Sequence, residues 1–111
     1  MKNKKNIIIT GASGQVGLSL IHLLKSDYHI IAISRKRMDI SGVSCFDCED
    51  LSNKDYSKII FKEITKKFKH IDVLINAAGG FDMGNIIEEQ EWENMMNINF
   101  HTMLNATINI L

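Results

Sequence analysis

Short apolar runs alternate with amphipathic segments along most of this chain, and glycine or polar residues separate them. The runs are rich in isoleucine and lack the strict polar/apolar alternation of a half-exposed strand. They therefore predict strands that are buried on both faces of a sheet. The predicted strands are Asn6–Thr10, His29–Ser34, Val43–Asp47 and Ile71–Asn76.

The segments between and after these runs predict helices. Gln15–Ser26 carries apolar residues at helical spacing, and Asn53 is a favourable N-cap for a helix over Lys54–Lys69. Glu88–Leu111 is acidic at its start and suits a long amphipathic helix, whereas Arg35–Gly42 is too polar for one. The apolar face of the helix after Asn53 is predicted to comprise Tyr56, Ile60, Ile64 and Phe68.

Strands that alternate with helices in this way indicate an α/β fold with a parallel sheet and right-handed crossovers. No proline-rich linker, repeat or low-complexity segment divides the 111 residues, which contain no proline. We therefore expect residues 1–111 to form a single domain.

A glycine-rich turn, Gly11 to Gly17, joins the first predicted strand to the first helix. Glycines at such a turn let the backbone approach a pyrophosphate, whose charge is stabilised by the free N–H groups of the helix N-terminus. The alternative is an ordinary strand-to-helix turn, and the absence of Gly-Lys-Ser/Thr excludes a Walker loop. The predicted phosphate- or dinucleotide-binding residues are Gly11, Ser13, Gly14, Gln15, Val16 and Gly17.

The end of the second predicted strand bears on cofactor choice. Ser34 and Arg35 follow Gly14 by 20 and 21 residues, where a dinucleotide fold reads the adenosine ribose. A carboxylate there would favour NAD(H), whereas an arginine can pair with the 2′-phosphate of NADP(H). No acid stands at this point, so Arg35, with help from Lys36 or Arg37, favours NADP(H) over NAD(H). The alternative is a solvated basic turn.

Four stretches, in order along the chain, resemble the short-chain dehydrogenase/reductase family. The most specific is Asn76-Ala77-Ala78-Gly79, at the end of the fourth predicted strand. The resemblance implies a Rossmann-like three-layer parallel sheet with strands in the order 3-2-1-4, incomplete relative to the family. It also implies carbonyl/alcohol interconversion by hydride transfer. The stretches are Thr10-Gly11 with Gly14 and Gly17, Asp50–Asn53, Ile71–Gly79, and Trp92 with Asn97–Phe100.

The resemblance assigns roles to individual residues. It implies that Asp50 contacts the adenine amino group, that Leu51 lies beside the adenine ring, and that the backbone of Asn99 supports a water in the proton relay. It further implies that a segment of the fourth strand borders the adenosine half of the cofactor. These segment residues are Asn76, Ala77, Ala78 and Gly79.

Each of these residues also has a purely structural interpretation. Asp50 starts a turn before Asn53, Asn76 ties the strand end to its neighbours, and Asn99 is a satisfied polar residue on a helix face.

The sequence also departs from the family. The Gly-x-x-Gly-x-x-Gly spacing is more similar to the extended branch, which includes sugar-nucleotide epimerases and deoxysugar reductases, whereas Asn76–Gly79 and Trp92–Asn99 look like the single-domain branch. The short segment between Arg35 and Val43 fits neither branch well. The family's catalytic Tyr-x-x-x-Lys is absent, because Tyr28 and Tyr56 are followed four residues later by Ala32 and Ile60, and the last serine is Ser57.

We therefore expect a truncated, cofactor-binding N-terminal half that is inactive alone. The uncapped apolar ending Leu104–Leu111 agrees with interruption inside an element. Three alternatives remain: a stand-alone dinucleotide-binding or regulatory module, a fragment of a sugar-nucleotide reductase or epimerase, and an interaction protein that pairs through its fourth strand and last helix.

Composition narrows the possible partners. Thirteen basic and thirteen acidic residues give zero net charge, so there is no electrostatic footprint for nucleic acid, and no apolar stretch is long enough to span a bilayer. We expect a cytoplasmic protein, with a small carbonyl or alcohol as substrate of the full enzyme and with homo-oligomer formation left open. Cys45 and Cys48 have C-x-x-C spacing, but no second pair completes a metal site, so strand-end cysteines are the favoured interpretation.

Overall fold

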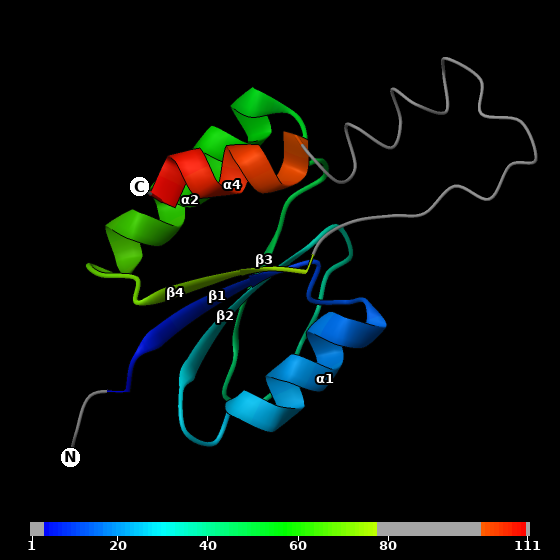
Figure 1. Ribbon diagram of the computed structural model, residues 1–111, viewed down its shortest axis with the longest axis vertical. Coiled ribbons are helices and arrows are strands. Elements are labelled where there is room, and N and C mark those ends of the chain that lie inside the picture. The colour runs from blue at the N-terminus through cyan, green and yellow to red at the C-terminus, as the bar shows by residue number, and fades with distance from the viewer. Residues whose placement is uncertain (1–3, 78–100, 111) are drawn as a thin grey trace, which may run out of the picture.

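The computed structural model describes residues 4–77 and 101–110. Within them, a four-stranded parallel sheet has one helix on one face and two helices on the other (Figure 1). The strand order β3-β2-β1-β4 confirms the predicted Rossmann-like three-layer α/β fold. The elements are β1 (Asn6–Thr10), α1 (Gln15–Leu24), β2 (His29–Ser34), β3 (Ser44–Asp47), α2 (Lys54–Lys67), β4 (Val73–Asn76) and α4 (Thr102–Ile110).

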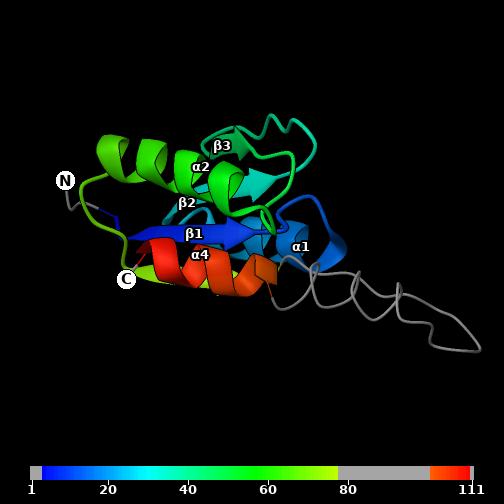
Figure 2. The ribbon, with the colours of Figure 1, turned by 90° about the horizontal axis from the view of Figure 1, so that it is seen from above.

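The direction of each crossover decides which face its helix covers. The α1 crossover leads from β1 to β2, whereas α2 leads from β3 back across the sheet to β4, and right-handed crossovers in opposite directions place their helices on opposite faces. Figure 2 shows α4 on the same side as α2. Since all strands are parallel, their carboxyl ends meet at one edge, where Thr10 pairs with Ile33 and with Asn76.

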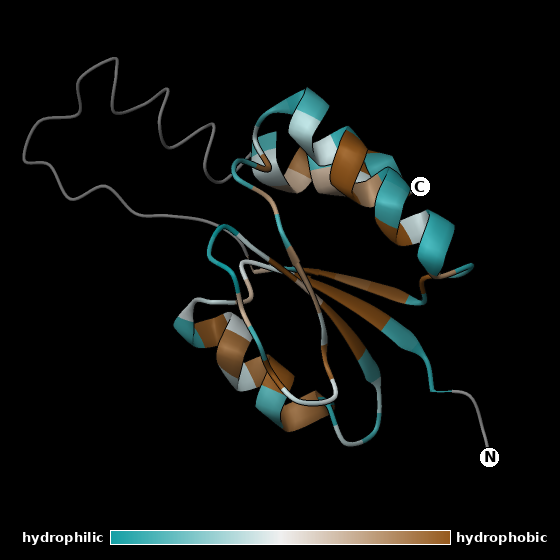
Figure 3. Cartoon of the chain, turned by 180° about the vertical axis from the view of Figure 1, so that it is seen from behind, coloured by the Kyte–Doolittle hydropathy of each residue, from teal (hydrophilic) through white to brown (hydrophobic). Residues whose placement is uncertain are grey.

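The core consists of two apolar clusters that the sheet separates. On β1, Ile7 and Ile9 face the α1 side, and Ile8 faces the side of α2 and α4. The side chains of β2 alternate in the same way, and the apolar strands are visible as brown ribbons at the centre of Figure 3. Because Ile7, Ile8 and Ile9 are at most 4% exposed, the expectation of burial on both faces is confirmed for β1, and β2 is buried in the same way. The outer strands β3 and β4 differ from the expectation, since they are only partly buried and Val73 on β4 is 42% exposed.

The connection between β2 and β3 contains no helix, as its polar composition predicts. Met38, Ile40 and Val43 nevertheless pack against the α1-side cluster. Gly42 has φ of 80°, a left-handed conformation that favours glycine, just before β3 begins. The loop therefore covers part of the sheet face beside α1 with isolated apolar side chains.

The α2 helix begins as predicted, because the Asn53 side-chain oxygen accepts hydrogen bonds from the N–H groups of Asp55 and Tyr56 at 2.9 and 3.1 Å. Its predicted apolar face is wrong at Tyr56, which is 44% exposed, whereas Ser57 is fully buried. The reason is the approach of α4, whose Asn109 Nδ2 lies 3.2 Å from Ser57 Oγ. A small residue at this position admits the second helix.

Several element ends differ by one or two residues from the prediction. The α1 and α2 helices end at Leu24 and Lys67, and β3 and β4 begin at Ser44 and Val73. Asp72 precedes β4 because its backbone and side chain both bond to the backbone of Asn6. Of the long helix predicted over 88–111, the structure describes α4; residues 88–100 and Leu111 lie outside the described residues.

The two cysteines lie on opposite faces of the sheet. Cys45 packs against the α1-side cluster, and Cys48 belongs to the cluster beneath α2 and α4. Both are free thiols, and burial raises the pKa of the Cys48 thiol. Within the described residues no group of three or more His, Cys, Asp and Glu side chains could hold a metal ion. None of the described helices is long and apolar enough to cross a membrane.

Hydrogen bonds among the side chains of Asn6, His29 and Ser44, called the polar clasp below, connect three strands at the amino edge of the sheet. His29 Nδ1 lies 2.9 Å from Asn6 Oδ1, and His29 Nε2 lies 2.9 Å from Ser44 Oγ. Asn6 Nδ2 donates to the carbonyl of His70, so Asn6 Oδ1 is the acceptor and the neutral ring carries its proton on Nδ1. The clasp thereby joins β1, β2 and β3 through one uncharged imidazole.

Acidification is expected to weaken this clasp. Burial lowers the pKa of His29 below 6.5, with smaller contributions from Lys4 and Lys67. His29 in the unfolded chain therefore binds a proton more readily than it does in the folded chain. The contribution of neutral His29 to stability is present above pH 6.5, the pKa of the unfolded chain, and it is lost as the pH falls from there toward the lower pKa of the folded chain. Denaturant unfolding of wild type and His29→Gln at several values from about pH 7.5 to about pH 5.5 should show a stability difference that shrinks at acid pH.

His22→Gln is the matched control, because it removes one exposed imidazole from α1. A stability difference between wild type and His29→Gln that is constant across this pH range would contradict the prediction.

Candidate functional site

The glycine turn is tied to the carboxyl ends of two strands. Gly11, directly after β1, has φ of 64°, which favours glycine. The N–H of the fully buried Ala12 donates to the Ile33 carbonyl at 3.1 Å, and the N–H of Gly14 donates to the Gly11 carbonyl at 3.1 Å. The turn is therefore held by β2 as well as by β1. Ala12, which the sequence did not single out, supplies that link.

Gly17 lets α1 approach this turn closely. A Cβ at this position would lie 2.4 Å from the Gly11 carbonyl oxygen and 2.8 Å from the Ala12 Cα, both of which are backbone atoms. Neither can move without displacing the turn, so a side chain does not fit. This is the close helix–strand approach that the third glycine of a dinucleotide-binding turn provides.

The first turn of α1 is open to an anionic ligand. Ser13, Gly14, Gln15 and Val16 are exposed, and no side chain among the described residues caps the helix, in contrast to α2. The first backbone N–H groups of a helix have no partner within it, and its dipole favours negative charge there. These features fit a pyrophosphate at the turn.

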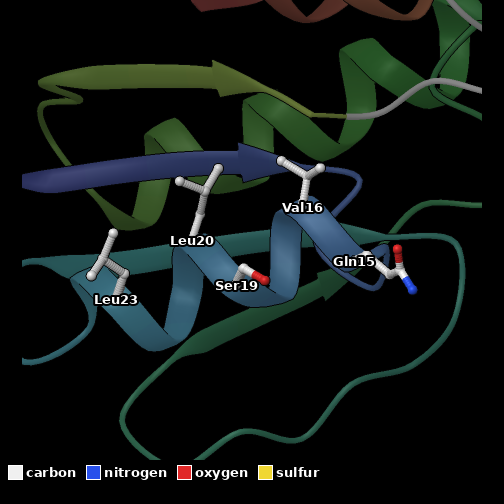
Figure 4. Close-up of a pocket in the computed structure, with 5 residues that line it drawn as sticks. All are labelled: Gln15, Val16, Ser19, Leu20 and Leu23. Atoms are coloured by element: carbon white, nitrogen blue, oxygen red, sulfur yellow. The ribbon is translucent and has the colours of Figure 1, made fainter.

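A hollow of about 300 Å³ lies along α1, and it is a weaker candidate for a ligand site than the glycine turn. In Figure 4, apolar side chains project along one side of the helix, and Gln15 points away at its N-terminal end. Because few polar groups converge there, nothing in the hollow would orient a ligand. Its lining residues are Gln15, Val16, Ser19, Leu20 and Leu23.

The end of β2 presents a basic side chain at the same edge. Arg35 is exposed, as are Lys36 and Arg37. Ser34 is 5% exposed, and its hydroxyl donates to the Lys36 carbonyl, so it shapes the turn after β2. The Cys48 N–H donates to the Ser34 carbonyl at 2.9 Å and fastens the end of β3 beside it.

Asp50 lies on an exposed loop after β3. Its Oδ1 accepts from the N–H of Ser52 at 3.0 Å and from the Ser52 hydroxyl, and its carbonyl accepts from the N–H of Asn53. The structure therefore contains the turn that was the structural alternative for Asp50. Leu51 is 7% exposed and packs in the cluster beneath α2 and α4.

A residue that the sequence did not indicate supports this loop. Asn105 on α4 is 5% exposed, and its Nδ2 donates to the Leu51 carbonyl at 3.0 Å and to the Ser52 carbonyl at 2.9 Å. The available signal was an asparagine inside the apolar sequence LNATINIL. Its partners lie more than fifty residues earlier, so periodicity alone could not identify them.

The end of β4 completes the described part of the edge. Asn76 is exposed, and its Nδ2 lies 3.4 Å from Thr107 Oγ1, so it ties the strand to α4. Ala77 packs against the α1-side cluster. Three further predicted site residues, Ala78, Gly79 and Asn99, lie outside the described residues.

The predicted site residues that the structure describes all follow the carboxyl ends of the strands. The edge combines an uncapped helix N-terminus, an exposed arginine and an exposed carboxylate. Ligands bind at this edge in open α/β sheets, near the point where the strand order reverses. Here that point is β1, since β2 and β4 flank it. The arrangement can bind the phosphates and the adenosine of a dinucleotide.

Comparisons with known proteins agree with this geometry. A family model described as short chain dehydrogenase matches residues 5–111. The 3-oxoacyl-[acyl-carrier-protein] reductase FabG of Staphylococcus aureus is 27% identical over 121 residues, covering 96% of this chain and 49% of the relative. A probable short-chain type dehydrogenase/reductase, VdlC of Helicobacter pylori, is 32% identical over 86% of this chain and 38% of its own length.

A solved structure is also similar. The ligand-free aldohexose dehydrogenase of Thermoplasma acidophilum superposes with a TM-score of 0.88 at 25% identity, covering 97% of this chain and 43% of that one. The chain thus spans about half the length of the FabG relative and less of the other two proteins.

Gly17→Ala tests the close approach of α1. Helix propensity alone predicts a gain of about 1 kcal/mol for alanine in a helix interior. We expect instead a loss of about 2 kcal/mol, because the new Cβ overlaps backbone of the turn. Denaturant unfolding measures the difference.

Gly14→Ala is the matched control, since its Cβ would lie 3.4 Å from the Gly11 oxygen and should cost less than about 1 kcal/mol. A Gly17→Ala variant as stable as wild type would show that the turn does not constrain α1.

Proposed function

Because the chain belongs to the short-chain dehydrogenase family, we propose that the carboxyl edge of its sheet binds a nicotinamide dinucleotide for carbonyl/alcohol interconversion. The observation that carries the proposal is the glycine turn, where Gly17 admits α1 against the backbone and leaves an uncapped helix N-terminus exposed. Such a turn gives a pyrophosphate both N–H donors and a favourable dipole. A helix that only connected two strands would gain stability from a side-chain cap at this end, and none of the described side chains caps α1.

Each group at the edge has a part in holding the cofactor. The turn from Gly11 to Gly17 holds the pyrophosphate, Asp50 accepts from the adenine amino group, and the end of β4 borders the adenosine. When bound, the nicotinamide supplies the hydride that is exchanged with the substrate carbon. The backbone at Asn99 supports a water in the proton relay. Leu51, which is 7% exposed, lies beside the adenine ring.

We propose NADP(H) in preference to NAD(H). Arg35 is exposed directly after β2, and no carboxylate stands at Ser34, Arg35 or Lys36 to accept from ribose hydroxyls. A guanidinium pairs with phosphate through parallel N–H donors, which gives it an advantage over a lysine at the same point. The buried Ser34 hydroxyl contributes by shaping the turn that presents Arg35.

The substrate class is a small carbonyl compound or alcohol. The curated relative and the solved structure carry names that refer to an acyl-carrier-protein substrate and to an aldohexose, so membership of the family leaves the substrate open. The 111 residues contain no Tyr-x-x-x-Lys to exchange the hydroxyl proton. Cofactor binding is therefore the part of the activity that these residues can perform.

Titration with NADPH and NADH tests the cofactor preference. We expect tighter binding of NADPH, and Arg35→Ala should weaken NADPH about tenfold while leaving NADH nearly unchanged, because the variant loses a charge-assisted phosphate pair. Lys5→Ala is a charge-matched control, since Lys5 is exposed just before β1, at the opposite edge. Equal affinities of the wild type for NADPH and NADH would overturn the NADP(H) preference without affecting the proposal of dinucleotide binding.

A turnover assay tests whether residues 1–111 bind the cofactor without catalysing the reaction. The polypeptide of residues 1–111, given NADPH and a panel of ketones, aldehydes and keto-sugars, should bind cofactor and show no loss of NADPH absorbance above buffer. Binding and turnover are measured on the same sample, so a polypeptide that does not fold is recognised by its lack of binding. Turnover well above buffer would show that a proton donor other than the family's tyrosine operates in this chain.

A further inference from the structure

Two asparagines lie one helical turn apart on α4 and make different contacts. Asn109 Nδ2 donates to the Asn105 carbonyl at 2.8 Å and to Ser57 Oγ on α2 at 3.2 Å. Asn105 reaches past α2 to the loop that precedes it, where its Nδ2 donates to the carbonyls of Leu51 and Ser52. The first residue joins helix to helix, and the second joins the helix to a loop of the candidate site.

Both donor protons of the Asn105 amide are used by this loop. Its side chain is almost completely buried, and both Nδ2 protons have an acceptor within 3.0 Å. A buried donor pair facing two consecutive carbonyls specifies the path of the backbone between them, because a rotated peptide would leave polar atoms without partners. The loop from Leu51 to Ser52 therefore has one position relative to α4.

That position determines where Asp50 lies. The Asp50 carbonyl accepts from Asn53, and its Oδ1 accepts from the backbone and side chain of Ser52, the residue whose carbonyl Asn105 holds. In the described part of the chain, only Oδ1 of this carboxylate has hydrogen-bond donors within the protein, and Asp50 is exposed. Its second oxygen takes part in neither of these hydrogen bonds, and the residue lies exposed at the carboxyl edge of the sheet.

We propose that Asn105 is a positioning residue for the adenine end of the cofactor, which it serves by holding the Asp50–Ser52 loop in place. The inference rests on the proposed function, since it takes Asp50 as the acceptor of the adenine amino group. Asn105 itself touches no cofactor atom in this proposal. It acts through two backbone carbonyls and the turn that they belong to.

Residues other than Asn105 also hold α4 against the core. Ala106 is fully buried in the core, Ile110 packs against the same cluster, and Asn109 bonds to α2. Removal of the Asn105 amide is therefore expected to release the loop and to leave the helix in place. This separation allows the positioning role to be measured apart from general stability.

The test compares two dinucleotides in the full chain: NADPH and its hypoxanthine analogue, which lacks the adenine amino group. Wild type should prefer NADPH. Asn105→Ala should weaken NADPH about tenfold, as expected for the loss of buried hydrogen bonds that hold the loop, and leave the analogue nearly unchanged, so that the preference disappears. If alanine impairs folding, Asn105→Ser is a second variant, because its hydroxyl keeps one donor at this buried position but cannot serve both carbonyls.

Asn109→Ala is the matched control. It removes an amide of equal size from the same face of α4, and the preference for NADPH should remain. An equal loss of both dinucleotides in the Asn105 variants, or an unchanged preference, would overturn the positioning role while the proposed function stands. A wild type that binds both dinucleotides equally would also overturn it. A wild type that binds neither dinucleotide would refute the proposed function itself.

Discussion

The close approach of α1 to the backbone at Gly17 is the constraint on which the candidate site depends. Because α1 lies so close to the turn, the helix can begin within it. The N–H groups of its first turn therefore lie at the carboxyl edge of the sheet. The same turn bonds to β2 through Ala12, which brings Arg35 to that edge. The proposed phosphate site and the position of Arg35 thus both involve the turn that Gly17 allows α1 to approach.

Much of this arrangement could be predicted from the sequence. The β1 and β2 strands have the predicted bounds, because their short apolar runs, Ile7–Ile9 and Ile30–Ile33, are typical of strands covered on both faces. The glycine turn was recognisable because its flanks, a strand and a helix, are local in sequence. Asn53 was identified as a cap for the same reason, since its partners are two and three residues away.

Contacts between distant segments could not be predicted in this way. Periodicity placed Tyr56 on the buried face of α2, yet the packing of α4 selects Ser57 instead. Asn105 lies inside the apolar ending Leu104–Leu111, which gave no sign of its partners, and its role emerges only when α4 meets the loop after β3. Both cases depend on what α4 packs against, which is decided by the tertiary fold and cannot be read from a short stretch of sequence.

The polar clasp at Asn6 has a further consequence for the specificity of the sheet. Because Ile7, Ile8 and Ile9 are chemically identical, a slip of β1 by one residue would keep two isoleucines in these three buried positions and would bring Asn6 or Thr10 into the third. Asn6 adds to the selection of one alignment, because its backbone and side chain bond to Asp72, His70 and His29 in only one register. The central strand therefore owes part of its alignment to a residue at its polar end, while its apolar residues supply the driving force.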